Sequence, residues 1–187
     1  QKAIMLPPGL AFVAYSDRAK ERFAEVTTPR FYLDLNKYLN SQEQNSTPFT
    51  PNVALFRGVN AYVELVKHEG FNHVIQRHYT IRDALRTALT TLELDLLVKD
   101  DSYASPTVTS FVPNNKEELS YIKDQLKSRF NITIAGGQGH LKGHILRIGH
   151  MGKVSPFDIL SVVSALEILL TEFRLSLIHI SEPTRPY

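Results

Sequence analysis

The second half of the sequence alternates between short β-type segments and helical segments, and this alternation constrains the fold more than any other feature. Residues 107–112 (TVTSFV) are β-branched or aromatic at most positions and are bounded by two prolines, which predicts a strand. Asn114, followed by Glu117 three residues later, has the spacing of a capping box and predicts a helix to about Phe130. Residues 131–134 predict another short strand.

The alternation continues to the end of the last helical pattern. A glycine-rich loop at 135–143 precedes a further predicted strand at 144–150. Ser155, with Asp158 three residues later and proline between them, predicts the start of a helix that extends to about Phe173. The order strand, helix, strand, strand, helix indicates a compact α+β layer, in which helices cover a small sheet.

The first part of the chain is more helical. Residues 10–15 form a nearly continuous apolar run after a Pro-Pro-Gly turn and predict a buried strand. Ser16 supplies a cap for a helix to about Val26. Residues 29–45 show weak periodicity and end in a polar stretch that predicts a surface loop. Two long helices follow, one starting at Thr50-Pro51 and one at about 72–92. The first carries an apolar stripe at Val53, Phe56, Val59, Val63 and Val66.

Composition excludes several classes of function. Lysine and arginine number 21 and aspartate and glutamate 19, and this net charge of +2 is too small to indicate a nucleic acid or an acidic membrane surface as a partner. The 187 residues include no cysteine, which excludes disulfides, thiolate metal sites and a cysteine nucleophile within them. The longest apolar run, 159–170, contains Glu167 and is too short to span a bilayer. We expect a cytoplasmic protein.

The last thirteen residues, LSLIHISEPTRPY (175–187), neither continue the helical stripe nor begin a convincing new element. They have the look of a translated sequencing adapter. We therefore expect a non-native tail and leave it out of the fold prediction.

Two basic residues are candidates for chemistry. Lys2 precedes a turn and an apolar segment. It is either an ordinary solvated lysine or a nucleophile able to condense with an aldehyde cofactor. Arg147 lies inside an apolar strand, where an unpaired guanidinium is costly, so it needs an anion. That anion is either an internal carboxylate or the carboxylate of a ligand, which the planar fork of arginine fits.

Other polar clusters are weaker candidates. Thr47 and Thr50 lie beside a predicted helix start, where helix capping explains one hydroxyl and an anion contact would explain both. The loop at 135–139 (AGGQG) is not followed directly by a helix, so it lacks the context of a phosphate-binding loop. Histidines recur every five residues at 68, 73 and 78. That spacing does not stack on one helical face, so we expect no metal site.

Several stretches together resemble the class V pyridoxal-phosphate aminotransferases, the group that includes alanine–glyoxylate and serine–pyruvate transaminases. The resemblance covers about residues 1–174 and rests on the order and spacing of four segments: QKAIMLPPGLAFVAYSDRA, STPFTP, SPTVTSFVP and AGGQGHLKGHILRIGHMG. It implies a fold-type-I transferase fragment with an α/β fold. Residues 1–71 would be the end of the large cofactor domain, and residues 72–174 would be the small α+β carboxy-terminal domain.

The resemblance also implies roles for individual residues. Lys2 would be catalytic, forming a Schiff base with pyridoxal 5'-phosphate and moving a proton at the substrate α-carbon. Gln1 would help to hold the cofactor phosphate. Thr47 and Thr50 would reach the phosphate of the neighbouring subunit in a homodimer with shared active sites. Arg147 would grip the substrate α-carboxylate.

The implied reaction transfers an amino group, in two half-reactions, from a small amino acid such as alanine or serine to a 2-oxo acid such as glyoxylate or pyruvate. In the family, the phosphate loop, the ring stacked on the cofactor and the aspartate paired with the pyridine nitrogen precede the lysine. By this resemblance the chain is the carboxy-terminal half of an enzyme, and we expect it to be inactive alone.

Three alternatives differ in their requirements. Cysteine desulfurases of the same fold use a cysteine downstream of the lysine, and this chain has none. A phosphoserine aminotransferase would need further basic residues for a substrate phosphate. A non-catalytic α+β interaction module would have no reactive lysine at all.

Overall fold

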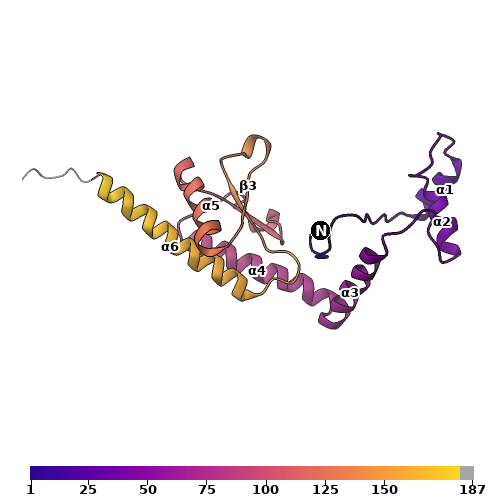
Figure 1. Ribbon diagram of the computed structural model, residues 1–187, viewed down its shortest axis with the longest axis horizontal. Helices are drawn as coiled ribbons and strands as arrows, with labels where there is room; N and C mark the ends of the chain where they lie inside the picture. Colours follow the sequence, from indigo (N-terminus) through magenta and orange to yellow (C-terminus); the bar gives the residue numbers. More distant parts are fainter. Residues whose placement is uncertain (182–187) are drawn as a thin grey trace, which may run out of the picture. The chain divides into compact units, whose positions relative to one another are not determined.

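The computed structural model describes residues 1–181, and the chain divides into two compact units (Figure 1). The first unit is Gln1 with Leu6–Leu65, and the second is Lys2–Met5 with the chain from Val66 onward. The short segment Lys2–Met5 therefore packs with residues that follow it by more than sixty positions. The boundaries 1–71 and 72–174 given above for the enzyme's domains stay a prediction.

The second unit is an α+β layer built on a four-stranded antiparallel sheet, as its strand pattern predicts. The strand order is β1-β2-β4-β3. The strands are β1 (Asp95–Leu96), β2 (Val108–Val112), β3 (Ala135–Gly136) and β4 (Leu146–Gly149). The helices are α4 (Phe71–Thr91), α5 (Lys116–Phe130) and α6 (Pro156–Ser181). Two 3₁₀ turns, Asp101–Tyr103 and Gly139–Leu141, complete this unit.

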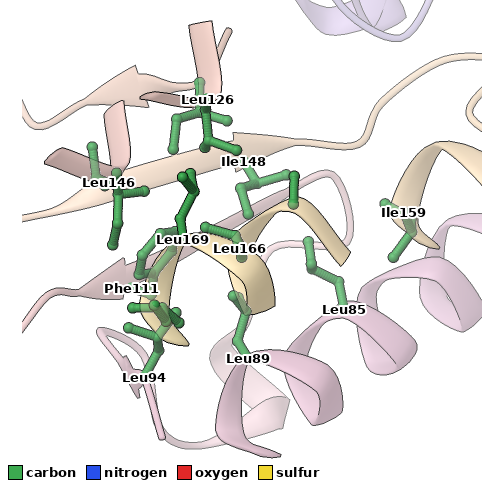
Figure 2. Close-up of a cluster of buried hydrophobic side chains, with 14 of the residues drawn as sticks. Leu85, Leu89, Leu94, Phe111, Leu126, Leu146, Ile148, Ile159, Leu166 and Leu169 are labelled. Carbon is green, nitrogen blue, oxygen red and sulfur yellow. The ribbon is translucent and has the colours of Figure 1, made fainter. Parts of the chain in front are cut away.

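One face of the sheet and the three helices enclose the hydrophobic core. Figure 2 shows Leu166 and Leu169 of α6 among side chains from β2, β4, α4 and α5. Phe111 and Leu146 are paired across β2 and β4 and are fully buried. Burial alternates along both strands, as expected where one sheet face is covered.

The opposite sheet face is not part of this core. Ser110 and Arg147 form the next pair along β2 and β4, so both project to the face away from Phe111 and Leu146. Both residues are half-buried. The register therefore places the candidate arginine on the open side of the sheet.

Helix caps in the second unit follow the predicted chemistry with one shift. Asn115, not Asn114, caps α5: its side chain accepts a hydrogen bond from the backbone N–H of Glu118 at 2.8 Å. The Glu118 carboxylate accepts in return from the N–H of Asn114 at 2.6 Å. The predicted box with Glu117 was one residue early. Either of the two adjacent asparagines can cap, and in the observed register the buried Glu118 carboxylate accepts from both the N–H and the side-chain amide of Asn114. Ser155 and Asp158 cap α6 as predicted.

The predicted strand at 131–134 is wrong. Asn131 ends α5 in the left-handed conformation (φ 55°), and the strand pairing begins only at Ala135. Ile134 is buried in the core without belonging to the ladder, so its apolar character reflects packing. The predicted strand at 144–150 is shorter, Leu146–Gly149, and β1 was not predicted.

The first unit contains α1 (Asp17–Glu25), α2 (Leu35–Glu43) and most of α3 (Val53–Glu69). Ser16 caps α1 as predicted. Asp34 caps α2, a helix that covers part of the polar stretch predicted to be a loop. A capped helix needs no strong apolar stripe, which explains that error.

Residues 10–15 do not form the predicted buried strand. They belong to no strand, and Phe12 and Val13 are 68% and 60% exposed. A strand requires a neighbour that offers backbone hydrogen bonds, and none of the strands described in residues 1–181 pairs with this segment.

The last helix extends further than predicted, to Ser181 instead of about Phe173. The sequence from 174 to 181 contains neither glycine nor proline, so nothing in it stops a helix. The remaining residues of the predicted non-native tail, 182–187, lie outside the described residues. Within residues 1–181, no helix has the combination of length and apolar character needed to cross a membrane.

Candidate active site

Lys2 stands at the start of a tight turn. The N–H of Met5 donates a hydrogen bond to the carbonyl oxygen of Lys2 at 3.0 Å, and Met5 adopts a left-handed backbone conformation (φ 61°). The Lys2 side chain is exposed, and no described residue forms a hydrogen bond or ion pair with its ε-amine. The lysine therefore has a fixed backbone and an unengaged amine.

The turn is docked on Gly152, which follows β4. A methyl group added at Gly152 would lie 2.6 Å from Met5 Cγ and 3.6 Å from the carbonyl oxygen of Ala3, so only glycine fits beneath the turn. The N–H of Lys153 donates to Met5 Sδ at 3.1 Å. Gly152 is buried and has φ +82°. Sequence reasoning missed Met5 and Gly152, although a glycine soon after a strand is a signal of close backbone approach.

Arg147 precedes Gly152 by five residues and lies on the open face of the sheet. Its Nε donates to the carbonyl oxygen of Gly136 on β3 at 2.8 Å, which fixes the direction of the side chain. Among the described residues it has no ion pair with a carboxylate. Within them, the internal salt bridge that was one explanation for this arginine is not formed. Both terminal nitrogens of the guanidinium are left for another anion.

The two threonines belong to the first unit. Thr47 is exposed and donates to the carbonyl oxygen of Phe49 at 2.7 Å, and Thr50 is also exposed. Neither caps α3, because Asn52 accepts from the N–H of Leu55 at 3.2 Å instead. The capping explanation for these hydroxyls is therefore wrong. Gln1 is exposed next to Lys2. The cofactor contacts of these three residues stay predictions.

The three regularly spaced histidines do not share one environment. His68 and His73 are exposed, whereas His78 is buried and bonds backbone atoms. Within the described part of the chain, no group of three or more histidine, aspartate or glutamate side chains is arranged to hold a metal ion.

Known proteins of similar sequence cover almost all of this chain. No protein-family model matches the sequence. The chain is 46% identical over 172 residues to the small subunit of a soluble hydrogenase from Synechococcus sp., covering 92% of this chain and 44% of that protein. It is 36% identical over 174 residues to an uncharacterized aminotransferase of Methanocaldococcus jannaschii, covering 92% of this chain and 45% of that protein. The chain thus spans about half the length of these relatives or slightly less.

A solved structure matches the fold closely. The pyridoxamine–pyruvate aminotransferase of Mesorhizobium loti superposes with a TM-score of 0.83 and 27% identity over 91% of this chain and 44% of that one. The homologues of this chain are class V aminotransferases. Its fold is that of part of a fold-type-I pyridoxal-phosphate enzyme.

The hydrogenase name of the Synechococcus relative describes that protein, of which this chain spans 44%.

Proposed function

We propose that this chain is the lysine- and arginine-bearing part of a pyridoxal-phosphate-dependent aminotransferase. The enzyme transfers an amino group from a small amino acid, such as alanine or serine, to a 2-oxo acid, such as glyoxylate or pyruvate. One observation carries the proposal: Lys2, with an unengaged amine, is docked through Gly152 onto the same unit that holds Arg147 without a carboxylate partner.

The residues present fit the cofactor. An exposed primary amine on a backbone fixed by a turn is what an aldehyde cofactor requires for covalent attachment, and Lys2 provides it. When bound, pyridoxal phosphate withdraws electrons from the substrate α-carbon and makes its proton acidic. Lys2 would hold the cofactor, and Gln1 would add a contact to the phosphate.

Lys2 would have a second task. Its free amine would move a proton between the substrate α-carbon and the cofactor carbon C4′. This requires the amine to stay close to that carbon. The turn that ends at Met5 limits how far the Lys2 backbone can move.

Arg147 would orient the amino acid. Its guanidinium offers two parallel N–H donors to the α-carboxylate, which fixes two atoms of the substrate at once. The bond from Nε to Gly136 leaves these donors free and prevents rotation of the fork. With the carboxylate held in this orientation, the bond between the α-carbon and its hydrogen would be the one that breaks.

The remaining assignments depend on a longer protein. Thr47 and Thr50 would contact the cofactor phosphate of a neighbouring subunit in a homodimer. Residues 1–71 and 72–174 would belong to the large and small domains. Several aminotransferases similar to this chain have glyoxylate or pyruvate in their names, which supports a small 2-oxo acid as acceptor. The 187-residue chain alone should show negligible activity.

The function is tested with the protein translated from the complete transcript. The purified protein, supplied with pyridoxal phosphate, is assayed for transfer from alanine and serine to glyoxylate and pyruvate. Lys2→Ala should reduce kcat by about three orders of magnitude. Lys20→Ala, at an exposed position of α1, is the matched control and should leave kcat unchanged. Equal activity in Lys2→Ala and the control would refute the assignment.

Arg147 is tested by the substrate dependence of the rate. Arg147→Lys keeps the positive charge but loses the two-pronged fork, so KM for the amino acid should rise roughly 10- to 100-fold. Arg18→Lys, on the exposed surface of α1, is the control. An unchanged KM in Arg147→Lys would show that another group binds the carboxylate.

A further inference from the structure

We propose that Arg77 and His78, adjacent residues of α4, are positioning residues for Lys2, an inference that rests on the function proposed above. Together they bind both backbone polar groups of Gly152, the residue on which the Lys2 turn is docked. Neither touches the lysine amine. They act by holding the surface against which the lysine's backbone packs.

His78 holds the N–H of Gly152. Its Nδ1 lies 2.7 Å from the carbonyl oxygen of Val74, which can only accept, so Nδ1 carries the proton and donates. Nε2 is then an acceptor, and the N–H of Gly152 donates to it at 3.1 Å. The two hydrogen bonds together require the neutral imidazole in one tautomer. His78 is 6% exposed, so water cannot readily replace either partner.

Arg77 holds the carbonyl of the same residue. Its Nη1 donates to the oxygen of Gly152 at 2.8 Å. Its Nε and Nη2 donate to the two carboxylate oxygens of Glu69 at 2.6 and 3.1 Å, and this two-pronged pair fixes the guanidinium plane. The hydrogen bond from Arg77 lowers the pKa of Glu69, so the carboxylate stays charged in neutral solution.

Gly152 contacts the lysine turn directly, so fixing the Gly152 backbone also restrains that turn. Its positive φ and its contact with Met5 leave no room for any side chain, so the turn follows the position of the Gly152 backbone. The bond from the N–H of Lys153 to Met5 Sδ adds a polar contact at the same place. The N–H of Met5 in turn closes the turn on the carbonyl of Lys2.

A purely structural role would give a different pattern. Arg77 and His78 are not among the residues of the hydrophobic core, which is formed by apolar side chains further along α4 and on the sheet, α5 and α6. Loss of the hydrogen bonds that Arg77 and His78 form with Gly152 should therefore loosen the backbone at Gly152 and the Lys2 turn more than it destabilises the fold.

Hydrogen exchange in the complete protein without added cofactor tests the restraint directly. In His78→Ala, the amides of Gly152 and Met5 should exchange roughly tenfold faster, the effect of losing one buried hydrogen bond, while amides of α5 stay unchanged. His73→Ala, at an exposed position of the same helix, is the matched control. His78→Gln keeps an acceptor for the Gly152 N–H and should restore slow exchange.

Arg77→Lys provides the second, independent variant, because it keeps the charge but cannot bind Glu69 and Gly152 together. It should also speed exchange at Met5. Faster exchange at Gly152 with no change at Met5, in either variant, would overturn the proposal, as would no change at both. A uniform increase at all amides, α5 included, would show a structural role and overturn it too.

Kinetics with pyridoxal phosphate then separate this inference from the function on which it rests. Both variants should lower kcat more than they raise KM for the amino acid, the reverse of Arg147→Lys. If the unaltered protein fails to attach the cofactor, the proposed function fails. The exchange result still decides whether Arg77 and His78 restrain the Lys2 turn.

Discussion

The two units of the chain differ in how much of their apolar surface they bury. The second unit encloses a continuous core of side chains that are almost fully buried. In residues 1–65, Leu55 is the one buried side chain, while Phe31, Tyr32 and Leu33 are between 63% and 79% exposed. The second unit is thus stabilised by its own packing. The helices of the first unit depend on caps such as Ser16 and Asp34 and on local contacts.

This difference indicates what each unit needs in order to function. Exposed aromatic residues in such number mark surfaces that other protein normally covers. The first unit, which holds Thr47 and Thr50, would acquire its packing from the rest of a longer protein. The second unit already carries Lys2, Gly152 and Arg147 on a self-sufficient core.

The largest expected effect is the loss of stability caused by a cavity in the core of the second unit. Leu166→Ala removes a fully buried side chain from α6 and should lower the free energy of unfolding by about 3–4 kcal/mol. Leu33→Ala, the same substitution at an exposed position of the first unit, should change it by about 0.5 kcal/mol or less. Denaturant unfolding of the chain, followed by circular dichroism, measures both. Equal losses of unfolding free energy in the two variants would contradict the difference in packing between the units.

The next effect depends on pH and belongs to the second unit, because the first contains no histidine. Burial lowers the pKa of His150 from 6.5 to about 4, and the charge of Arg82 adds a smaller lowering. Its Nε2 bonds the hydroxyl of Thr109 at 2.8 Å, and its buried Nδ1 has no partner among the described atoms. The folded chain therefore resists taking up a proton at His150.

Between pH 6.5 and about 4 the unfolded chain binds a proton at this imidazole that the folded chain does not. The free energy of unfolding should then fall as the pH falls through this window, by about 3 kcal/mol at most, and His150 contributes no further change below it. His150→Gln should flatten this part of the stability profile. A profile identical to that of the unaltered chain would contradict the account.

The smallest expected effect is the loss of stability when a helix N-cap side chain is removed, and the two units offer one such cap each. Asn115→Ala removes the side-chain acceptor at the start of α5 and should cost about 1 kcal/mol in global unfolding. Asp34→Ala removes the equivalent acceptor from α2 in the first unit, where it should reduce helix content without shifting the main transition. A shift of equal size for both variants would mean that the units unfold together.

Local signals predicted much of the fold. The stripe of α3, the β-branched run of β2 and the Ser155–Asp158 cap each depend on neighbours within a few residues, so the sequence shows them directly. The two-residue strands β1 and β3 exist only through pairing with distant partners and have no local signature. Residues 10–15 were wrongly predicted for the converse reason: a β-type pattern without a partner strand is not a strand.

The candidate site divides in the same way. Lys2 and Arg147 could be singled out from their residue types and surroundings in the sequence. Met5 and Gly152 could not, because the contact that joins them spans almost the whole chain, and the bonds from Arg77 and His78 to Gly152 cross about 75 residues. Such contacts form only when α4, β4 and the first residues come together in one unit.

The central claim is that the amine of Lys2 holds the aldehyde cofactor, and the most direct measurement maps that attachment. The complete protein is incubated with pyridoxal phosphate, reduced with borohydride, digested and analysed by mass spectrometry. The account predicts the reduced cofactor on Lys2, with the exposed lysines of α1 and α5 unlabelled. Label on another lysine in preference to Lys2, or no label above a denatured control, would contradict it.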